Sequence, residues 1–141
     1  MANECYPLYE PGAAITAEAV GAVVGKRFVR INGAKEAGST LTPSGPDQTS
    51  GGNVLVDQAL TAGQQPFGVA DRDAAIGQKF GVLRGGVVPM ECGAAGLAAG
   101  AEVQADVDGR PVTKAAGIGV GTALTAAAVG TEVMIALHGL S

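Results

Sequence analysis

Apolar residues alternate with polar or small residues in several short runs of the chain, and glycines or turn residues separate these runs. In 132–140 the apolar residues Val133, Ile135 and Leu137 alternate with positions 134, 136 and 138. Such alternation puts successive side chains on opposite faces of a strand, so that one face is buried and the other exposed. The same argument predicts further strands in 14–31, 53–60, 67–70, 79–91 and 102–113.

Three of these segments contain residues that predict a bend or turn. In 14–31 the branched side chains and two glycines favour two strands with a bend, although a short helix over 16–20 is also compatible. Gly85 and Gly86 permit a bend inside 79–91. The clearest hairpin lies in 102–113: Val103, Ala105 and Val107 alternate, Asp108–Gly109 forms the turn, and Val112 begins the return strand.

The sequence contains a weak internal repeat. The stretch "GVADRDAAIGQKFGVLRGG" (68–86) resembles "GVGTALTAAAVGTEVMIALHG" (119–139) when Gly68 is aligned with Gly119 and Gly77 with Gly130. The second copy keeps the strand–turn–strand pattern but lacks the charges of Asp71, Arg72 and Asp73. We therefore interpret the phrase as a repeated building unit, and its charged residues as a solvated or subunit-facing bend.

The whole pattern predicts an all-β fold, either a small β-barrel or a sandwich built of short hairpins. Short strands, frequent turn signals and the absence of a convincing amphipathic helix favour this class. The alanine-rich segments 93–101 and 122–129 could hold a helical turn or two. We expect a single β-domain over 14–141.

Two further segments lack the strand pattern. Residues 1–13 contain Pro7, Pro11 and the tyrosines Tyr6 and Tyr9, which favours an extended N-terminal arm packed against another part of the core. The segment 32–53 is a long polar loop. Leu41 is its only large apolar residue, so the segment is either a surface loop or an arm that orders against a neighbouring subunit.

Composition suggests a thin core. The 141 residues include 23 glycines but only three Phe, two Tyr and no Trp. Because small side chains bury little apolar area each, we expect self-association to supplement the stability of one subunit.

Charge and hydropathy argue against nucleic-acid and membrane partners. The formal net charge is −4, and the basic residues cluster only at 26–30. On a strand, Lys26 and Arg30 would share one face and Arg27 the other, and we interpret them as a solvated surface rather than a phosphate site. The longest uncharged stretch, 115–131, is too short and too rich in glycine to span a bilayer, and the N-terminus does not resemble a secretory signal.

The sequence offers little for catalysis, cofactors or metals. His138 is the only histidine and Cys5 and Cys92 are the only cysteines, which is too few for a zinc site. The glycines of 117–124 do not complete a dinucleotide-binding motif. We predict no catalytic, cofactor-binding or metal-binding residue, and we interpret both cysteines as buried core thiols rather than a disulfide.

A small hydrolase is the least favoured alternative. It would use Asp71 with Asp73, or Cys92 with His138. Asp71–Asp73 and the similar pair Asp106–Asp108 flank turn residues, where aspartate commonly accepts hydrogen bonds from the local backbone. That local role is the simpler explanation of both pairs.

The order of the pieces in 66–140 resembles the small capsid decoration, or cement, proteins of tailed bacteriophages. The resemblance rests on "PFGVADRDAAIGQKFGVLRGGVV", "AAGLAAGAEVQADVDGRPVT" and "GIGVGTALTAAAVGTEVMIALHG", and extends more loosely to 15–31. The chain departs from the family pattern in "GIGVGTAL" (117–124) and in the longer insertion at 32–53.

The resemblance implies a structural virion protein that is made in the host cytoplasm and binds the outside of the capsid. Its partners would be the major capsid protein and further copies of itself in a homotrimer, and the family supplies no catalytic residues. The candidate subunit or capsid contacts are Tyr6, Tyr9, Leu41, Asp71, Arg72 and Asp73. The alternative is another virion β-domain, such as a head fibre or spike base.

Overall fold

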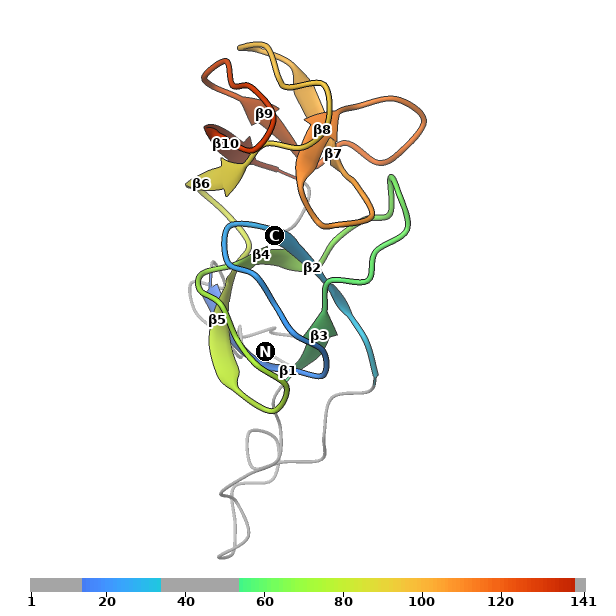
Figure 1. The fold of residues 1–141 in the computed structure, drawn as a ribbon, viewed down its shortest axis with the longest axis vertical. Coiled ribbons are helices and arrows are strands. Elements are labelled where there is room, and N and C mark those ends of the chain that lie inside the picture. Colours follow the sequence, from blue (N-terminus) through green and yellow to red (C-terminus); the bar gives the residue numbers. More distant parts are fainter. Residues whose placement is uncertain (1–13, 34–53, 139–141) are drawn as a thin grey trace, which may run out of the picture.

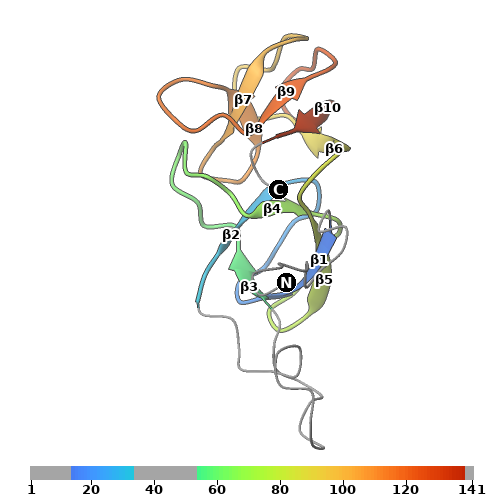
Figure 2. The same ribbon diagram turned by 180° about the vertical axis from the view of Figure 1, so that it is seen from behind.

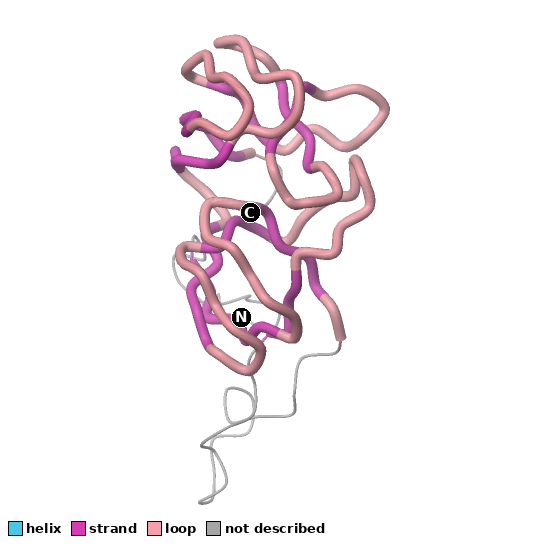
Figure 3. Tube along the Cα trace, viewed as in Figure 1, coloured by secondary structure: helices cyan, strands magenta, loops and turns pink. Residues whose placement is uncertain are grey.

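The computed structural model describes residues 14–33 and 54–138, which form strands and connecting loops (Figure 3). Tyr6, Tyr9, Leu41 and Cys5 lie outside these residues. The strands are β1 (Ala14–Ala19), β2 (Phe28–Ile31), β3 (Val54–Asp57), β4 (Gly68–Ala70), β5 (Lys79–Leu83), β6 (Val87–Glu91), β7 (Glu102–Ala105), β8 (Pro111–Thr113), β9 (Gly121–Ala123) and β10 (Glu132–Leu137). The described residues contain no helix, so the all-β prediction is confirmed.

Strands β1 to β5 form a closed barrel in the order β1-β3-β2-β4-β5, in the lower part of Figure 1. Strand β1 closes it, because it pairs in parallel with β3 and antiparallel with β5. The interior is filled by Val29, Val56, Phe80 and Val82 together with small residues such as Ala17, all of them buried. We call residues 14–33 and 54–84 the first unit.

Strands β6 to β10 form a second five-stranded sheet in the order β6-β10-β9-β7-β8. It lies above the barrel in Figure 1 and in the view from behind in Figure 2. Its core contains Met90, Val103, Val133 and Ile135, which are all fully buried. We call residues 87–137 the second unit.

The two units share one strand order, with β1 to β5 corresponding in order to β6 to β10. They differ in closure, because β1 pairs with β3 in the barrel whereas β6 and β8 are the edge strands of the second sheet. In the first unit the β1–β2 and β4–β5 connections meet in an antiparallel bridge between Val23 and Ala74. In the second unit the equivalent connections meet in a bridge between Leu97 and Ala127. Each bridge has two reciprocal backbone hydrogen bonds of 2.8–2.9 Å. The repeat predicted from the sequence is therefore present, and it extends over the whole described structure.

The structure corrects the register of that repeat, since Gly68 corresponds to Gly121 and not to Gly119. A Cβ atom on Gly68 would lie 2.5 Å from Val82 Cγ1, and one on Gly121 would lie 2.6 Å from Ile135 Cγ2. Val82 and Ile135 are themselves equivalent positions of β5 and β10. Each glycine is therefore required by the side chain at the equivalent position of the neighbouring strand. The sequence alone does not show this contact.

The helical turns considered for 93–101 and 122–129 are absent. Ala95 and Gly96 have φ angles of +66° and +70°, which a right-handed helix excludes. Leu97 and Ala127 are committed instead to the bridge between the two connections. Alanine content made a helical turn possible here, but cross-strand pairing determines the backbone.

The predicted hairpin in 102–113 is confirmed, with a longer loop than a two-residue turn. Strand β7 ends at Ala105, and Val107 is an exposed loop residue rather than a strand residue. The Asp106 carboxylate accepts hydrogen bonds from the amides of Asp108 (2.9 Å) and Arg110 (2.8 Å). This local role is the one expected for the Asp106–Asp108 pair.

The units share one apolar core cluster. Phe28, Leu60 and Val69 of the first unit pack with the buried residues of the second sheet, on the outer side of the barrel. The two sheets are therefore joined by packing as well as by the chain.

Candidate interaction surface

The basic cluster at 26–30 is neutralised by carboxylates. Lys26 Nζ lies 2.6 Å from Glu132, Arg27 lies 2.9 Å from Glu91, and Arg30 Nε lies 2.8 Å from Asp57. The first two pairs join the two units. These contacts leave the cluster little capacity for a phosphate. Arg27 and Arg30 are only partly exposed, however, so the solvated surface expected from the sequence is found at Lys26 alone.

One detail of that interpretation was wrong. Lys26 has a φ of +63° and lies in the turn before β2, so it does not share a strand face with Arg30. Its amide donates to the carbonyl of Ala70 (2.9 Å), and this bond holds the turn against β4.

The charged bend Asp71–Asp73 follows β4, and its carboxylates accept hydrogen bonds from amides of other segments rather than from the local backbone that the sequence suggested. Asp71 Oδ1 accepts a hydrogen bond from the Gly81 amide (3.2 Å), and Asp73 Oδ1 accepts one from the Gly25 amide (2.8 Å). The exposed Arg72 donates to Asp71 (3.1 Å), and this hydrogen bond and the charge of Asp71 raise the pKa of the guanidinium. Each carboxylate therefore already stabilises a connection of the barrel, and the role of these residues in contacts between proteins stays a prediction.

Cys92 and His138 lie at opposite ends of β10. The Cys92 amide donates to the Thr131 carbonyl (2.8 Å) before β10, whereas the His138 amide donates to the Val120 carbonyl (3.0 Å) after it. At about 3.3 Å per residue, the intervening strand separates them by roughly 20 Å. Burial raises the pKa of the Cys92 thiol, which is a free and buried core residue as predicted. The geometry therefore gives no support to a Cys–His pair.

No group of three or more His, Cys, Asp or Glu side chains in 14–33 and 54–138 is arranged to hold a metal ion. In that part of the chain, no helix has the length and apolar character needed to cross a bilayer.

The second unit carries an exposed apolar surface on the outside of β6, β10 and β9. We call it the apolar strip and define it as Val87, Pro89, Leu124 and Met134. Val87 is 50% exposed, Leu124 48% and Met134 45%. Met134 pairs with Pro89 in the sheet, and its carbonyl accepts a hydrogen bond from the Leu124 amide (2.8 Å), so these three residues lie in one row across the strands.

The equivalent row of the first unit is polar. There Thr16 pairs with Gly81, whose carbonyl accepts a hydrogen bond from the Asp71 amide (3.0 Å). The Asp71 carboxylate covers Gly81, because a Cβ on this glycine would lie 2.6 Å from Asp71 Oδ2. The shared architecture tolerates either surface, so the fold does not require the apolar strip.

Sequence reasoning placed Met134 on the outward face of its strand but missed the strip as a surface. An apolar residue at an outward position was the available signal. Its neighbours are Pro89 of β6 and Leu124, the residue after β9, and only the pairing of β10 with β6 and β9 brings the three together.

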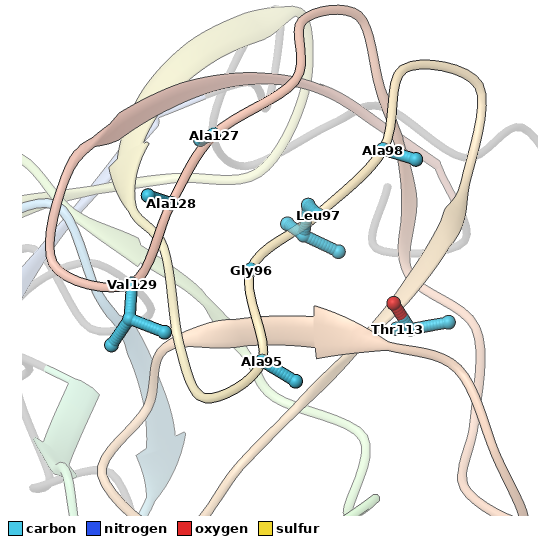
Figure 4. Close-up of a pocket in the computed structure, with 8 residues that line it drawn as sticks. All are labelled: Ala95, Gly96, Leu97, Ala98, Thr113, Ala127, Ala128 and Val129. Atoms are coloured by element: carbon cyan, nitrogen blue, oxygen red, sulfur yellow. The ribbon is translucent and has the colours of Figure 1, made fainter.

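A second feature is a shallow hollow of about 630 Å³ in the second unit (Figure 4). It is lined by Ala95, Gly96, Leu97, Ala98, Thr113, Ala127, Ala128 and Val129. It lies between β8 and the β6–β7 connection. We call the line along which this connection lies beside β8 the seam, and here the Gly93 amide donates to the Pro111 carbonyl (2.9 Å). Thr113 supplies its only side-chain polar group, so the hollow lacks the groups that acid–base or nucleophilic chemistry requires.

Comparison with known proteins agrees with a structural role. A family profile described as phage cement protein matches residues 9–138. The fold is similar to that of the N base of the head fibre gp8.5 of bacteriophage phi29, with a TM-score of 0.64 and 18% sequence identity over 89% of this chain and 92% of that one. No curated protein sequence matches the chain significantly. Since the profile covers nearly the whole sequence, the chain belongs to the phage cement protein family and is a structural protein of the virion, on the outside of the capsid.

Proposed function

We propose that this protein binds the outer surface of a phage capsid through the major capsid protein, stabilises the shell as a homotrimer, and has no enzymatic activity. The observation that carries the proposal is the apolar strip. Contiguous exposed apolar surface marks sites of contact between proteins, and permanent interfaces between copies are more apolar than transient ones. We assign the strip to the contact between subunits of the trimer.

The distribution of polar groups supports this assignment. The strip lies on the second unit only, because Thr16, Gly81 and Asp71 replace it in the first. Trimer formation through the second unit leaves the first unit, with the charged bend Asp71–Asp73, available for the shell. Tyr6, Tyr9 and Leu41 remain candidate contacts from the segments outside the described residues.

The mass of the protein in solution tests the subunit contact. Light scattering of the wild type is expected to give three times the chain mass, whereas Met134→Glu is expected to give the mass of one chain. Thr16→Glu is the matched control, since it places the same charge at an exposed position of the same row in the first unit. A monomeric wild type, or a trimeric Met134→Glu variant, would contradict the assignment.

Binding to capsids tests the cement function itself. Purified protein added to undecorated heads is expected to bind saturably and to raise the temperature at which the heads release their contents. Electron microscopy of the decorated heads is expected to show copies over the whole shell. Copies confined to a few positions would support the alternative of a head-fibre or spike base.

A further inference from the structure

The second unit contains a slot that is filled by a turn of the first unit. The β3–β4 connection reaches the second unit in both views (Figures 1 and 2), and its Gly63 amide donates to the Ala105 carbonyl at the end of β7 (2.8 Å). The Ile118 amide in turn donates to the Gly63 carbonyl (3.0 Å). The fit is close, because a Cβ on Gly63 would lie 2.7 Å from Gly117 Cα. One turn residue, with a φ of +78°, is thus held by two backbone hydrogen bonds.

The repeat places an equivalent slot in the first unit, at the end of β2. Ile31 is the counterpart of Ala105. The Asn32 amide donates to the Leu55 carbonyl of β3 (2.9 Å), so the alternation of an antiparallel ladder directs the Ile31 carbonyl away from β3. The structure has a hollow of about 320 Å³ here. Its lining residues are Arg30, Ile31, Gln64, Gln65, Pro66, Phe67 and Arg84.

The two slots differ in charge. The first unit has Arg30 and Arg84 where the second has Gln104 and Leu137. Arg84 is fixed in position, because its Nε donates to the Phe67 carbonyl (3.0 Å) and its guanidinium lies 4.5 Å from the centre of the Phe67 ring. Arg30 is paired with Asp57, but no carboxylate of residues 14–33 and 54–138 forms an ion pair with Arg84. A preoriented guanidinium of this kind is suited to bind a carboxylate in two hydrogen bonds.

We propose that the slot formed by Arg30, Ile31, Gln64, Phe67 and Arg84 binds an extended acidic segment of the capsid shell protein. A carboxylate of that segment pairs with Arg84, and a backbone amide donates to the Ile31 carbonyl, as Gly63 does to Ala105. This inference rests on the proposed cement function and deepens it by naming the contact. In other protein complexes an extended peptide pairs its backbone groups with an exposed sheet edge.

A second copy of this chain is less suited to the slot. Its segment equivalent to the Gly63 turn is the β8–β9 connection, which begins with the exposed, positively charged Lys114. The amides of Ala115 and Gly117 in that connection already donate to Gln104 Oε1 (both 2.9 Å). A basic connection with occupied amides does not complement a slot that contains Arg84.

Binding of purified variants to undecorated heads tests the proposal. Arg84→Gln is expected to lower the affinity for heads about tenfold, and the wild-type affinity is expected to fall with rising salt concentration. Lys79→Gln removes an exposed charge of β5 outside the slot and is expected to bind like the wild type. Arg84→Leu is a second variant. It is expected to fold, since the second unit has Leu137 at the equivalent position. Both Arg84 variants are expected to keep the oligomeric mass of the wild type.

A photo-reactive residue introduced at Gln64 identifies the occupant. The expected product on decorated heads is a cross-link to an acidic segment of the shell protein. A cross-link to a second copy, the absence of any cross-link, or Arg84 variants that bind as tightly as the wild type would each overturn the proposal. If the wild type itself does not bind heads, the cement function fails as well, which distinguishes the two failures.

Discussion

The Phe28 amide donates a hydrogen bond of 2.6 Å to the carbonyl of Gly109, where the tip of the β7–β8 hairpin meets the start of β2. Phe28 is fully buried and belongs to the core cluster of the second unit, although it lies in the first. Gly109 has a φ of +80°, and a Cβ here would lie 2.5 Å from the Phe28 carbonyl oxygen. The hairpin tip is therefore a close contact between the two units as well as a turn.

Gly109→Ala is expected to destabilise the protein more than an ordinary glycine substitution. Alanine at a left-handed φ costs about 1–2 kcal/mol, and the contact with the Phe28 carbonyl adds to this cost. Gly100→Ala is the matched control, because Gly100 has a φ of +85° but a Cβ on it would meet no atom within 4 Å. Urea unfolding would show a larger loss for Gly109→Ala, and equal losses for the two variants would contradict the close contact.

The strands were predictable where alternation was regular. Val133 and Ile135 are fully buried and Met134 is exposed, as period-two patterning requires. The Asp108–Gly109 turn was recognisable from its residue types, and Gly109 does adopt a positive φ. Local chemistry therefore identified the building unit and its turns.

The relations between units were not predictable from the sequence. The sequence favours Gly119 as the match of Gly68, because each precedes a valine, and only the position of Ile135 across the sheet shows that Gly121 is the match. The apolar strip depends in the same way on the neighbours of Met134 in other strands. Pairing between strands that are far apart in the sequence determines both features. This pairing cannot be read from a single sequence, so neither feature could be predicted.

The buried carboxylate of Asp57 predicts a loss of stability in acid. Burial raises the pKa of Asp57, but hydrogen bonds from Arg30, Asn32 and the Ala59 amide outweigh burial and hold the pKa below its usual value. A depressed pKa stabilises the folded state above the unfolded pKa of about 3.9, and this stability is lost as the pH falls through the folded pKa.

Asp57→Asn is therefore expected to cost about 1–3 kcal/mol at neutral pH. The difference in unfolding free energy between wild type and variant should stay constant above about pH 5 and shrink below about pH 4. Urea titrations between pH 2 and 7 would measure it. A difference that persists unchanged at pH 2 would show that the charge of Asp57 is not its source.

Cys92 is expected to be unreactive in the folded protein. Its side chain is buried and its pKa is raised by burial, so the thiol stays protonated at neutral and mildly alkaline pH. In a Cys5→Ser chain, Ellman's reagent should label no thiol at pH 8 under native conditions and one thiol in urea. Rapid labelling of the native protein would contradict this, and would reopen the interpretation of Cys92 as a nucleophile.

The seam of the second unit allows a test of the correspondence between the two units. Its equivalent in the first unit lies between β3 and the β1–β2 connection. In the first unit, Gln58 closes the seam, because its Oε1 accepts from the Val24 amide (2.9 Å) and its Nε2 donates to the Val24 carbonyl (2.6 Å). In the second unit the equivalent residues are Thr113 and Ala98, and both line the open hollow of Figure 4. Threonine is too short to make the same two hydrogen bonds.

Replacing Gln58 by threonine and Thr113 by glutamine should therefore have opposite effects on stability. Gln58→Thr is expected to destabilise the protein by about 1–2 kcal/mol, since each net hydrogen bond contributes about 0.5–1.5 kcal/mol. Thr113→Gln is expected to stabilise it by up to about 1 kcal/mol, because the longer side chain reaches the Ala98 backbone and covers the hollow. Urea unfolding measures both changes. If Thr113→Gln destabilised the protein as Gln58→Thr does, the two seams would not be equivalent, and the correspondence between the units would end before β8.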